Sequence, residues 1–359
     1  MSARPSGRHA PASDQDDQDL FAGLSRLQPE YRPTPLLDLP ALAKRCGVGR
    51  VLVKDESVRP LGNFKSLGGV FAGLRALARA TGAPGVQALL SAPPGQSRLP
   101  ALVTASDGNH GLSVATAARL AGAAARIYLP ASVPTARSDR IAAAGAEVIR
   151  IRGTYDDAVA AAAEAVRSGG GLLVPDTGDR VDDIVLDDVM TGYALIAREI
   201  AGQLGDVRPT HLFVQAGVGG LAAALAKAFA ELLAEPPMTI VVEPASADCV
   251  GRALASGRPE LVPGELDTAA EMLACGLASA HAVALLRKHQ AKAIAVPEER
   301  LQEAVAAMAA AGGPVTTPSG ACGLAGLLGA ASDDELRGEF QFSADAVVLV
   351  IASEGAVPA

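Results

Sequence analysis

Lys65 is the residue of this chain whose neighbours best suit it for chemistry. It lies in the segment Gly62-Asn63-Phe64-Lys65-Ser66-Leu67-Gly68-Gly69, where an apolar helix is predicted to start. Small residues let a flat ring approach the backbone, and an amine held out of bulk water is unprotonated often enough to attack a carbonyl group. The segment therefore predicts a Schiff-base lysine. An ordinary lysine at a helix start is the alternative, because short motifs also match by chance.

A second candidate is the loop Ser106-Asp107-Gly108-Asn109-His110, which lies between a predicted strand and an Ala-rich helix. Ser, Asp and Asn are all good N-caps, so capping the helix is one explanation of this loop. It has more consecutive polar or Gly positions than one cap needs, and its N–H groups would face a substrate carboxylate. We therefore expect a ligand loop, with Ser106, Asp107, Gly108 and His110 at the substrate.

The glycine-rich loop Ala216-Gly217-Val218-Gly219-Gly220 connects a predicted strand to a helix of Leu and Ala. Backbone N–H groups at a helix start, with no side chains in the way, suit a phosphate group. A dinucleotide site is the rival, but its fingerprint is G-x-G-x-x-G in the first βα turn, whereas this G-x-G-G lies late in the chain. Glu243 ends the next predicted strand, so a nicotinamide cofactor stays open as an alternative.

The elements that must position these loops alternate along the chain. Short β-branched runs are followed by helix-length Ala/Leu segments, as parallel βαβ units require, and such sheets bind ligands at the carboxyl ends of their strands. The predicted strands are 51–54, 101–104, 126–129, 147–150, 171–174, 211–215, 239–242, 291–296 and 346–351. The sequence thus predicts an α/β fold with its chemistry just after the strands.

Composition narrows the class of protein further. The 359 residues fit two sub-domains around a cleft, and 49% of them are hydrophobic. The net charge of −8, without clustered Lys and Arg, argues against a nucleic-acid partner. The four cysteines form no C-x-x-C pair, so we expect buried free thiols and no metal site. We expect no membrane segment, a cytoplasmic location and, over residues 1–20, a disordered leader.

In combination these motifs resemble the fold-type-II pyridoxal-phosphate enzymes, which include serine and threonine dehydratases, and within them the diaminopropionate ammonia-lyase family. The resemblance runs from about Gln28 to Gly355. It also rests on the segments Arg32-Pro33-Thr34-Pro35-Leu36, Leu52-Val53-Lys54-Asp55-Glu56-Ser57, Tyr155-Asp156-Asp157, Asp176-Thr177, Gly192-Tyr193, Val242-Glu243-Pro244, Ala247-Asp248-Cys249, Leu273-Ala274-Cys275-Gly276, Ser319-Gly320-Ala321 and Ser353-Glu354-Gly355.

The resemblance implies a tryptophan synthase β-like fold, with two open, twisted, mainly parallel sheets flanked by helices and the cofactor in the cleft. It implies a large cofactor-binding domain, 21–87 and 179–359, and a small domain, 88–178, that carries the Ser-Asp-Gly-Asn-His loop. A homodimer is the expected assembly.

The resemblance also implies roles for single residues. Lys65 would form the Schiff base with pyridoxal 5′-phosphate, beside Phe64 as a further cofactor-binding residue. Gly217, Val218, Gly219 and Gly220 would hold the phosphate, Asn109 would bind the 3′ oxygen, and Ser353 would face the pyridine nitrogen. A hydroxyl there leaves the nitrogen largely unprotonated, which suits β-elimination.

The reaction we expect is elimination of the β-substituent of a small amino acid, with 2,3-diaminopropionate giving pyruvate and ammonia. Lys65, once freed, would remove the Cα proton. Asp107 is a second candidate base; on the opposite face it would allow both enantiomers to react. Asp176 would attract a β-ammonium group, unless it is only a strand-end turn former.

Two features leave alternatives open. After Asp176, this chain has an Asp-rich segment, residues 178–188, where the ammonia-lyases carry aromatic residues, so the pocket wall could differ or the segment could be merely solvated. The alternative functions are a serine/threonine-type dehydratase or a racemase on the same fold, and a non-catalytic pyridoxal-phosphate-binding protein. A non-catalytic protein would be expected to carry a damaged Lys65 or Asn109 motif, and both motifs are intact.

Overall fold

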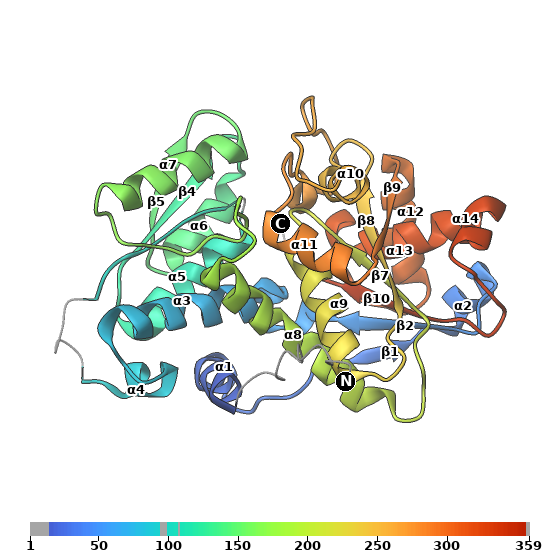
Figure 1. The fold of residues 1–359 in the computed structure, drawn as a ribbon, viewed down its shortest axis with the longest axis horizontal. Helices are drawn as coiled ribbons and strands as arrows, with labels where there is room; N and C mark the ends of the chain where they lie inside the picture. Colours follow the sequence, from blue (N-terminus) through green and yellow to red (C-terminus); the bar gives the residue numbers. More distant parts are fainter. Residues whose placement is uncertain (1–13, 94–98, 107, 357–359) are drawn as a thin grey trace, which may run out of the picture.

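Two sheets organise the chain and lie side by side (Figure 1). The computed structural model describes residues 14–93, 99–106 and 108–356. The larger sheet has the strand order β1-β2-β10-β7-β8-β9 and the smaller one β5-β4-β3-β6. Every pairing is parallel except that of β1 with β2. The expected α/β class with two mainly parallel sheets is confirmed.

Each strand predicted from the sequence is present. The larger sheet consists of β1 (Leu36–Asp38), β2 (Arg50–Asp55), β7 (His211–Gln215), β8 (Met238–Pro244), β9 (Lys292–Val296) and β10 (Val347–Ala352). The smaller sheet consists of β3 (Leu102–Ala105), β4 (Ala125–Pro130), β5 (Glu147–Ile151) and β6 (Leu172–Leu173). Of the strands in the described residues, only β1 was not predicted, because three residues are too short to show a periodic pattern.

Helices cover both sheets. They are α1 (Asp14–Leu27), α2 (Pro40–Cys46), α3 (Lys65–Thr81), α4 (Val86–Ser91), α5 (Asn109–Ala121), α6 (Thr135–Ala143), α7 (Tyr155–Arg167), α8 (Ile184–Leu204), α9 (Gly220–Leu232), α10 (Cys249–Ser256), α11 (Ala280–Lys288), α12 (Glu298–Ala310), α13 (Pro318–Ala331) and α14 (Asp334–Glu339). Short 3₁₀ turns are η1 (Glu56–Val58), η2 (Pro60–Gly62) and η3 (Glu271–Leu273).

Helix α1 corrects the expected disordered leader. The helix begins at Asp14, so residues 14–20 are ordered, while residues 1–13 lie outside the described residues. Leu20 is 1% exposed, and Asp19 Oδ1 accepts the backbone N–H of Val86 at 2.7 Å. The sequence misled because the first turn is Asp-rich and polar, and the tertiary contacts that stabilise it come from α3 and α4.

Helix α3 joins the two halves, because it packs against both α5 and α8. Its glycines make this close approach possible. A Cβ on Gly68 would lie 2.5 Å from the ring of Tyr193 in α8, and one on Gly69 would lie 2.6 Å from Cβ of Ser113 in α5. Lys65, the first residue of α3, is therefore held between the sheets. The division into domains at 87/88 and 178/179 stays a prediction.

A buried ion network stabilises the segment between β2 and Lys65 by joining it to α8. Glu199 of α8 contacts Lys54 Nζ at 2.6 Å and Arg59 Nη1 at 2.8 Å, and Arg59 Nη2 contacts Glu56 Oε1 at 2.6 Å. These four side chains are at most 2% exposed. Two cations face two anions, so each buried charge is paired as its desolvation requires.

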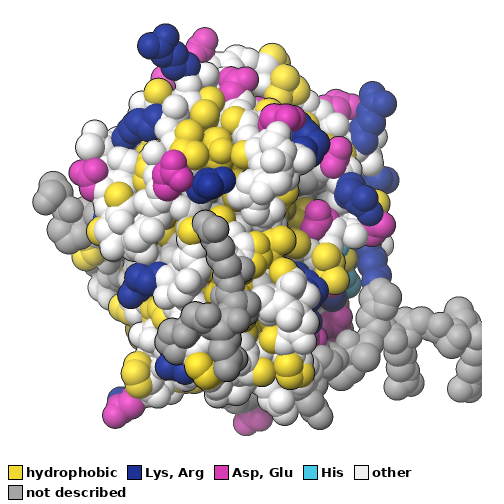
Figure 2. Space-filling view, turned by 90° about the vertical axis from the view of Figure 1, so that its left-hand side faces the viewer, with side chains coloured by type: hydrophobic (Ala, Val, Ile, Leu, Met, Phe, Trp, Pro, Cys, Tyr) yellow, Lys and Arg dark blue, Asp and Glu magenta, His cyan; other side chains and the backbone are white. Residues whose placement is uncertain are grey.

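Acidic, basic and apolar side chains are mixed on the face of the molecule that carries α4 and α7 (Figure 2). Within the described part of the chain, no helix combines the length and the apolar character needed to cross a bilayer.

Candidate active site

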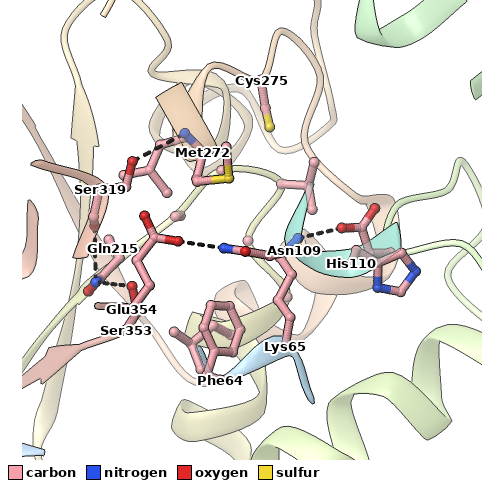
Figure 3. Close-up of a pocket in the computed structure, with 18 of the residues that line it drawn as sticks. Phe64, Lys65, Asn109, His110, Gln215, Met272, Cys275, Ser319, Ser353 and Glu354 are labelled. Carbon is pink, nitrogen blue, oxygen red and sulfur yellow. Dashed lines mark hydrogen bonds and ion pairs between the residues drawn. The ribbon is translucent and has the colours of Figure 1, made fainter. Parts of the chain in front are cut away.

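A cavity opens where loops from both sheets meet (Figure 3). Its walls are the loops that directly follow β3, β7 and β10, together with the start of α3 and the turn η3. These are carboxyl ends of parallel strands, as predicted. The cavity brings together all the predicted site residues that the structure describes: Phe64, Lys65, Ser106, Gly108, Asn109, His110, Asp176, Gly217, Val218, Gly219, Gly220 and Ser353.

Lys65 and Asp176 form the charged centre of the cavity. Lys65 Nζ lies 2.5 Å from Asp176 Oδ2, and the phenol of Tyr155 donates to Asp176 Oδ1 at 2.8 Å. Burial alone would lower the pKa of the Lys65 amine, but the Asp176 carboxylate outweighs burial and raises it. Burial likewise opposes ionisation of Asp176, yet Lys65 holds the pKa of that carboxyl below its ordinary range.

This pairing bears on one element of the sequence argument. An amine that is unprotonated often enough to attack was expected, whereas the side chain of Lys65, 23% exposed, lies against a carboxylate that raises the pKa of the amine. The partner that causes this lies 111 residues away in sequence. It also gives Asp176 a contact beyond that of a turn former.

The glycine loop presents bare backbone to the cavity. Helix α9 starts at Gly220, and its N-cap, Gly219, has a positive φ of 97° and offers no side-chain cap. A Cβ on Gly219 would lie 3.2 Å from Ala282 Cβ, and one on Gly217 would lie 3.0 Å from the sulfur of Cys275. The first N–H groups of a helix have no acceptor within the helix. The loop therefore has the geometry of an anion cradle, and a side chain at Gly217 or Gly219 would disturb it.

The loop after β3 is shaped by Ser106. Its Oγ accepts the backbone N–H groups of Gly108 at 2.9 Å and of Gly111 at 2.8 Å, so this hydroxyl holds the loop and caps α5 from within. Gly108 has φ 150°, and a Cβ there would lie 3.2 Å from Cδ of Arg137. The predicted candidate base Asp107 lies outside the described residues.

His110 lies in the wall of the cavity with a defined protonation state. Its Nε2 lies 2.8 Å from the carbonyl oxygen of Val174, while Nδ1 has no hydrogen-bond partner among the described residues. Burial lowers the pKa of His110. The contact with a carbonyl oxygen requires a hydrogen on Nε2, and the lowered pKa favours the neutral ring, in which Nδ1 is an acceptor.

Ser353 follows β10 and is held by Gln215, the last residue of β7. Gln215 Nε2 donates to Ser353 Oγ at 2.8 Å. Because that donor occupies an oxygen lone pair, the hydroxyl hydrogen of Ser353 is free to donate to another group. Gln215 directly precedes the glycine loop, so its place at the end of a predicted strand is a signal that could have identified it.

Other lining residues were not predicted as site residues. Tyr155, Tyr193, Met272, Cys275, Ser319 and Glu354 belong to segments of the family resemblance or lie next to them, but nothing local in the sequence aims them at the cavity. All four cysteines are buried and free, as expected. Among the described residues, no cluster of His, Cys, Asp and Glu could hold a metal ion.

Two acidic features lie outside the cavity. In the Asp-rich segment, Asp183 caps α8 through Val185 N at 2.8 Å, and Asp188 pairs with Arg79 at 2.5 Å. No described residue of 178–188 lines the cavity. Glu243 is 1% exposed and accepts the N–H groups of Val250 and Gly251, each at 2.7 Å. The side chain of Glu243, in β8, is therefore engaged by the first turn of α10. This removes the support that Glu243 gave to a nicotinamide site.

Comparison with known proteins gives concordant matches over nearly the whole chain. Residues 27–354 match the family described as "Pyridoxal-phosphate dependent enzyme". A diaminopropionate ammonia-lyase from Escherichia coli K12 is 34% identical, covering 97% of this chain and 91% of its own.

Solved structures match as well. The holo diaminopropionate ammonia lyase of Escherichia coli, in a selenomethionine form, has a TM-score of 0.84 and 31% identity over 98% of this chain and 91% of its own. The same lyase with an "aminoacrylate-PLP azomethine reaction intermediate" has a TM-score of 0.83 and 31% identity, again over 98% of this chain and 91% of its own.

Proposed function

The chain belongs to the family of pyridoxal-phosphate-dependent enzymes, and we propose that it is a carbon-nitrogen lyase that converts 2,3-diaminopropionate to pyruvate and ammonia. The observation that carries this proposal is the contact of 2.5 Å between Lys65 Nζ and Asp176 Oδ2, inside a cavity that also holds a glycine cradle. The Asp176 carboxylate beside this amine is placed to pair with the second ammonium group of diaminopropionate.

The residues of the cavity fit pyridoxal phosphate. The backbone N–H groups of Gly217–Gly220 at the start of α9 would hold the phosphate, and a Cβ at Gly217 or Gly219 would press on Cys275 or Ala282 and displace the loop. Lys65 offers the amine for the aldehyde, and the free hydroxyl hydrogen of Ser353 suits an unprotonated pyridine nitrogen. When bound, the cofactor withdraws electrons from an attached amino acid and so makes its Cα proton acidic.

The substrate would be oriented by the loop after β3. The backbone N–H groups that Ser106 does not accept, close to the start of α5, would bind the α-carboxylate. The hydroxyl of Ser106 keeps this loop in shape from behind. A neutral His110 would add no positive charge that competes with the substrate's ammonium group for Asp176.

The proton transfers would use two groups. Lys65, as a neutral amine, would take the Cα proton at Nζ. Asp176 would then exchange the Lys65 ammonium for the β-ammonium of the substrate, with Tyr155 holding its other oxygen in place. Asp107 is proposed as a second base for the other enantiomer, on the basis of its sequence position.

One assay tests the proposal. Purified protein with pyridoxal phosphate should release pyruvate and ammonia from both D- and L-diaminopropionate. The kcat/KM for diaminopropionate should be higher than that for serine, threonine or β-chloroalanine. The expected stoichiometry is two ammonia per pyruvate from diaminopropionate, because both amino groups leave. A preference for serine or threonine would refute the proposed substrate while leaving the cofactor assignment intact.

We further propose that the protein works as a homodimer in the cytoplasm. The support is the resemblance to the family, together with the absence, in the described residues, of a helix able to span a membrane. Sedimentation equilibrium of the cofactor-bound protein would give the mass of one chain if the dimer proposal is wrong.

A further inference from the structure

A chain of hydrogen bonds in the wall of the cavity links Lys65 to a buried carboxyl group. The backbone N–H of Lys65 donates to Asn63 Oδ1 at 3.1 Å, and Asn63 Nδ2 donates to Asn109 Oδ1 at 3.2 Å. Asn109 Nδ2 in turn donates to Glu354 Oε2 at 2.5 Å, the contact drawn in Figure 3. The side chain of Asn109 is therefore gripped at both ends of its amide.

The contacts of Asn63 determine which way the Asn109 amide faces. An amide nitrogen has two hydrogens to donate, and its oxygen only accepts. Asn63 must place its oxygen toward the Lys65 N–H and its nitrogen toward the carbonyl oxygen of Leu61, 3.0 Å away. Its remaining hydrogen meets Asn109 Oδ1, so Nδ2 of Asn109 must face Glu354. One Nδ2 hydrogen goes to that carboxyl group, and the other is left over.

Glu354 is itself held firmly. Its Oε1 accepts the hydroxyl of Thr317 at 2.6 Å, and the residue is 9% exposed. A β-bridge joins Glu354 to Asn63, and Gly355 N donates to Gly62 O at 3.0 Å. The two residues that grip Asn109 thus belong to segments whose backbones are fixed to one another. Burial raises the pKa of the Glu354 carboxyl, but Oε2 can accept from Asn109 in either protonation state.

We propose that Glu354 is a positioning residue: together with Asn63 it holds the Asn109 amide so that the second Nδ2 hydrogen is kept for the 3′ oxygen of pyridoxal phosphate. This inference rests on the proposed function, because it needs that cofactor in the cavity. A hydrogen bond to the 3′ oxygen stabilises its negative charge. Through Asn109, Glu354 would therefore influence the electronic state of the ring.

The experiment compares Glu354→Gln, Glu354→Ala and wild type as cofactor-free proteins titrated with pyridoxal phosphate. In Glu354→Gln the side-chain oxygen still accepts from Asn109, and its NH₂ group can donate to Thr317 Oγ1, so we expect wild-type binding and spectrum. In Glu354→Ala the acceptor is lost. We expect a Kd about 3- to 10-fold higher and, at saturating cofactor, a weaker visible band with a stronger near-ultraviolet band.

The band ratio at saturation is the decisive readout, because a purely structural defect would change affinity but not the protonation of bound cofactor. A wild-type ratio in Glu354→Ala would overturn the inference, as would equal changes in Glu354→Gln and Glu354→Ala. If Glu354→Ala does not fold, Asn63→Asp replaces it. That variant still accepts from Lys65 N but cannot donate to Asn109 Oδ1, so its band ratio must also change; an unchanged ratio refutes the inference.

The same titration separates this inference from the proposed function. A wild-type protein that binds no pyridoxal phosphate would refute the proposed function. A wild type that binds it, with a Glu354→Ala variant that matches it, would refute only the role of Glu354.

Discussion

Lys65 Nζ and Asp176 Oδ2 lie 2.5 Å apart, although the two residues enter the cavity from different parts of the fold. Lys65 starts α3, whereas Asp176 follows β6 of the smaller sheet. In the proposed reaction, the ion pair would keep the Asp176 carboxylate ionised until the second ammonium group of the substrate replaces Lys65. It also sets a pH dependence for cofactor uptake.

The first prediction concerns that pH dependence. Attack on the cofactor aldehyde needs a neutral amine, and Asp176 raises the pKa of Lys65, so the uptake rate of wild-type protein should rise with pH across the neutral range. In Asp176→Asn the carboxylate that raises the pKa of Lys65 is lost, while burial still lowers that pKa. Its uptake profile, followed by stopped-flow absorbance, should shift to lower pH.

The same substitution should reduce elimination from diaminopropionate by roughly 10²- to 10⁴-fold, the usual worth of a positioned acid or base. Asp139→Asn, an exposed aspartate of α6, is the matched control and should behave as wild type in both assays. An uptake profile that does not move, or full elimination activity, would count against the role of Asp176.

The second prediction tests the glycine cradle. Gly219→Ala puts a Cβ at a residue with φ 97° and only 3.2 Å from Ala282 Cβ, so the loop must shift. We expect the Kd for pyridoxal phosphate to rise by about tenfold or more, while binding of pyridoxal, which lacks the phosphate, changes little.

Fluorescence titration with both compounds would measure this difference. Gly202→Ala is the control, because a Cβ there meets no atom within 4 Å and helix interiors favour alanine. Equal losses for pyridoxal and pyridoxal phosphate would show that the cradle does not bind the phosphate.

The third prediction concerns the buried ion network. Glu199→Gln leaves the cations of Lys54 and Arg59 with one compensating anion, Glu56, so the free energy of unfolding should fall by about 3–5 kcal/mol. Urea unfolding would measure the change, with exposed Glu235→Gln as the control.

The sign of the pH dependence follows from the direction of the shift. Burial raises the pKa of Glu199, but Arg59 and Lys54 outweigh burial and lower it to about 2. The contribution of the ionised Glu199 to the free energy of unfolding is complete above the pKa of the unfolded state, about 4.3. It is lost as pH falls toward 2. The gap in stability between wild type and Glu199→Gln should therefore narrow below about pH 4; a constant gap would contradict this account.

The fourth prediction concerns the two enantiomers of the substrate. Asp107 lies between Ser106 and Gly108, which both line the cavity. If Asp107 is the base for one face and Lys65 for the other, Asp107→Asn should lower kcat for one enantiomer of diaminopropionate by about 10²-fold or more and affect the other much less. Equal losses for D- and L-diaminopropionate would exclude a base that serves one face.

The sequence was informative where the signal is local. The nine predicted strands, the glycine cradle and the presentation of Lys65 all follow from short patterns of β-branched, apolar and glycine residues. The helix over residues 14–20 was missed because its stability comes from contacts with α3 and α4 rather than from its polar first turn.

The polar details of the site depend on the fold and could not be predicted. Asn109 and Glu354 are 245 residues apart in sequence and become partners only when the loops after β3 and β10 meet. The protonation of Lys65 depends in the same way on Asp176. The Asp-rich segment suggested an altered pocket wall, but Asp188 is used to pair with Arg79.

The most direct test is to reduce the cofactor-loaded protein with borohydride and to map the pyridoxyl group by peptide mass spectrometry. The account predicts a single modified residue, Lys65, and no modification or visible absorption in Lys65→Ala, whereas Lys44→Ala on the exposed face of α2 should be labelled like wild type. A pyridoxyl group on another lysine, or none on the loaded wild-type protein, would contradict it.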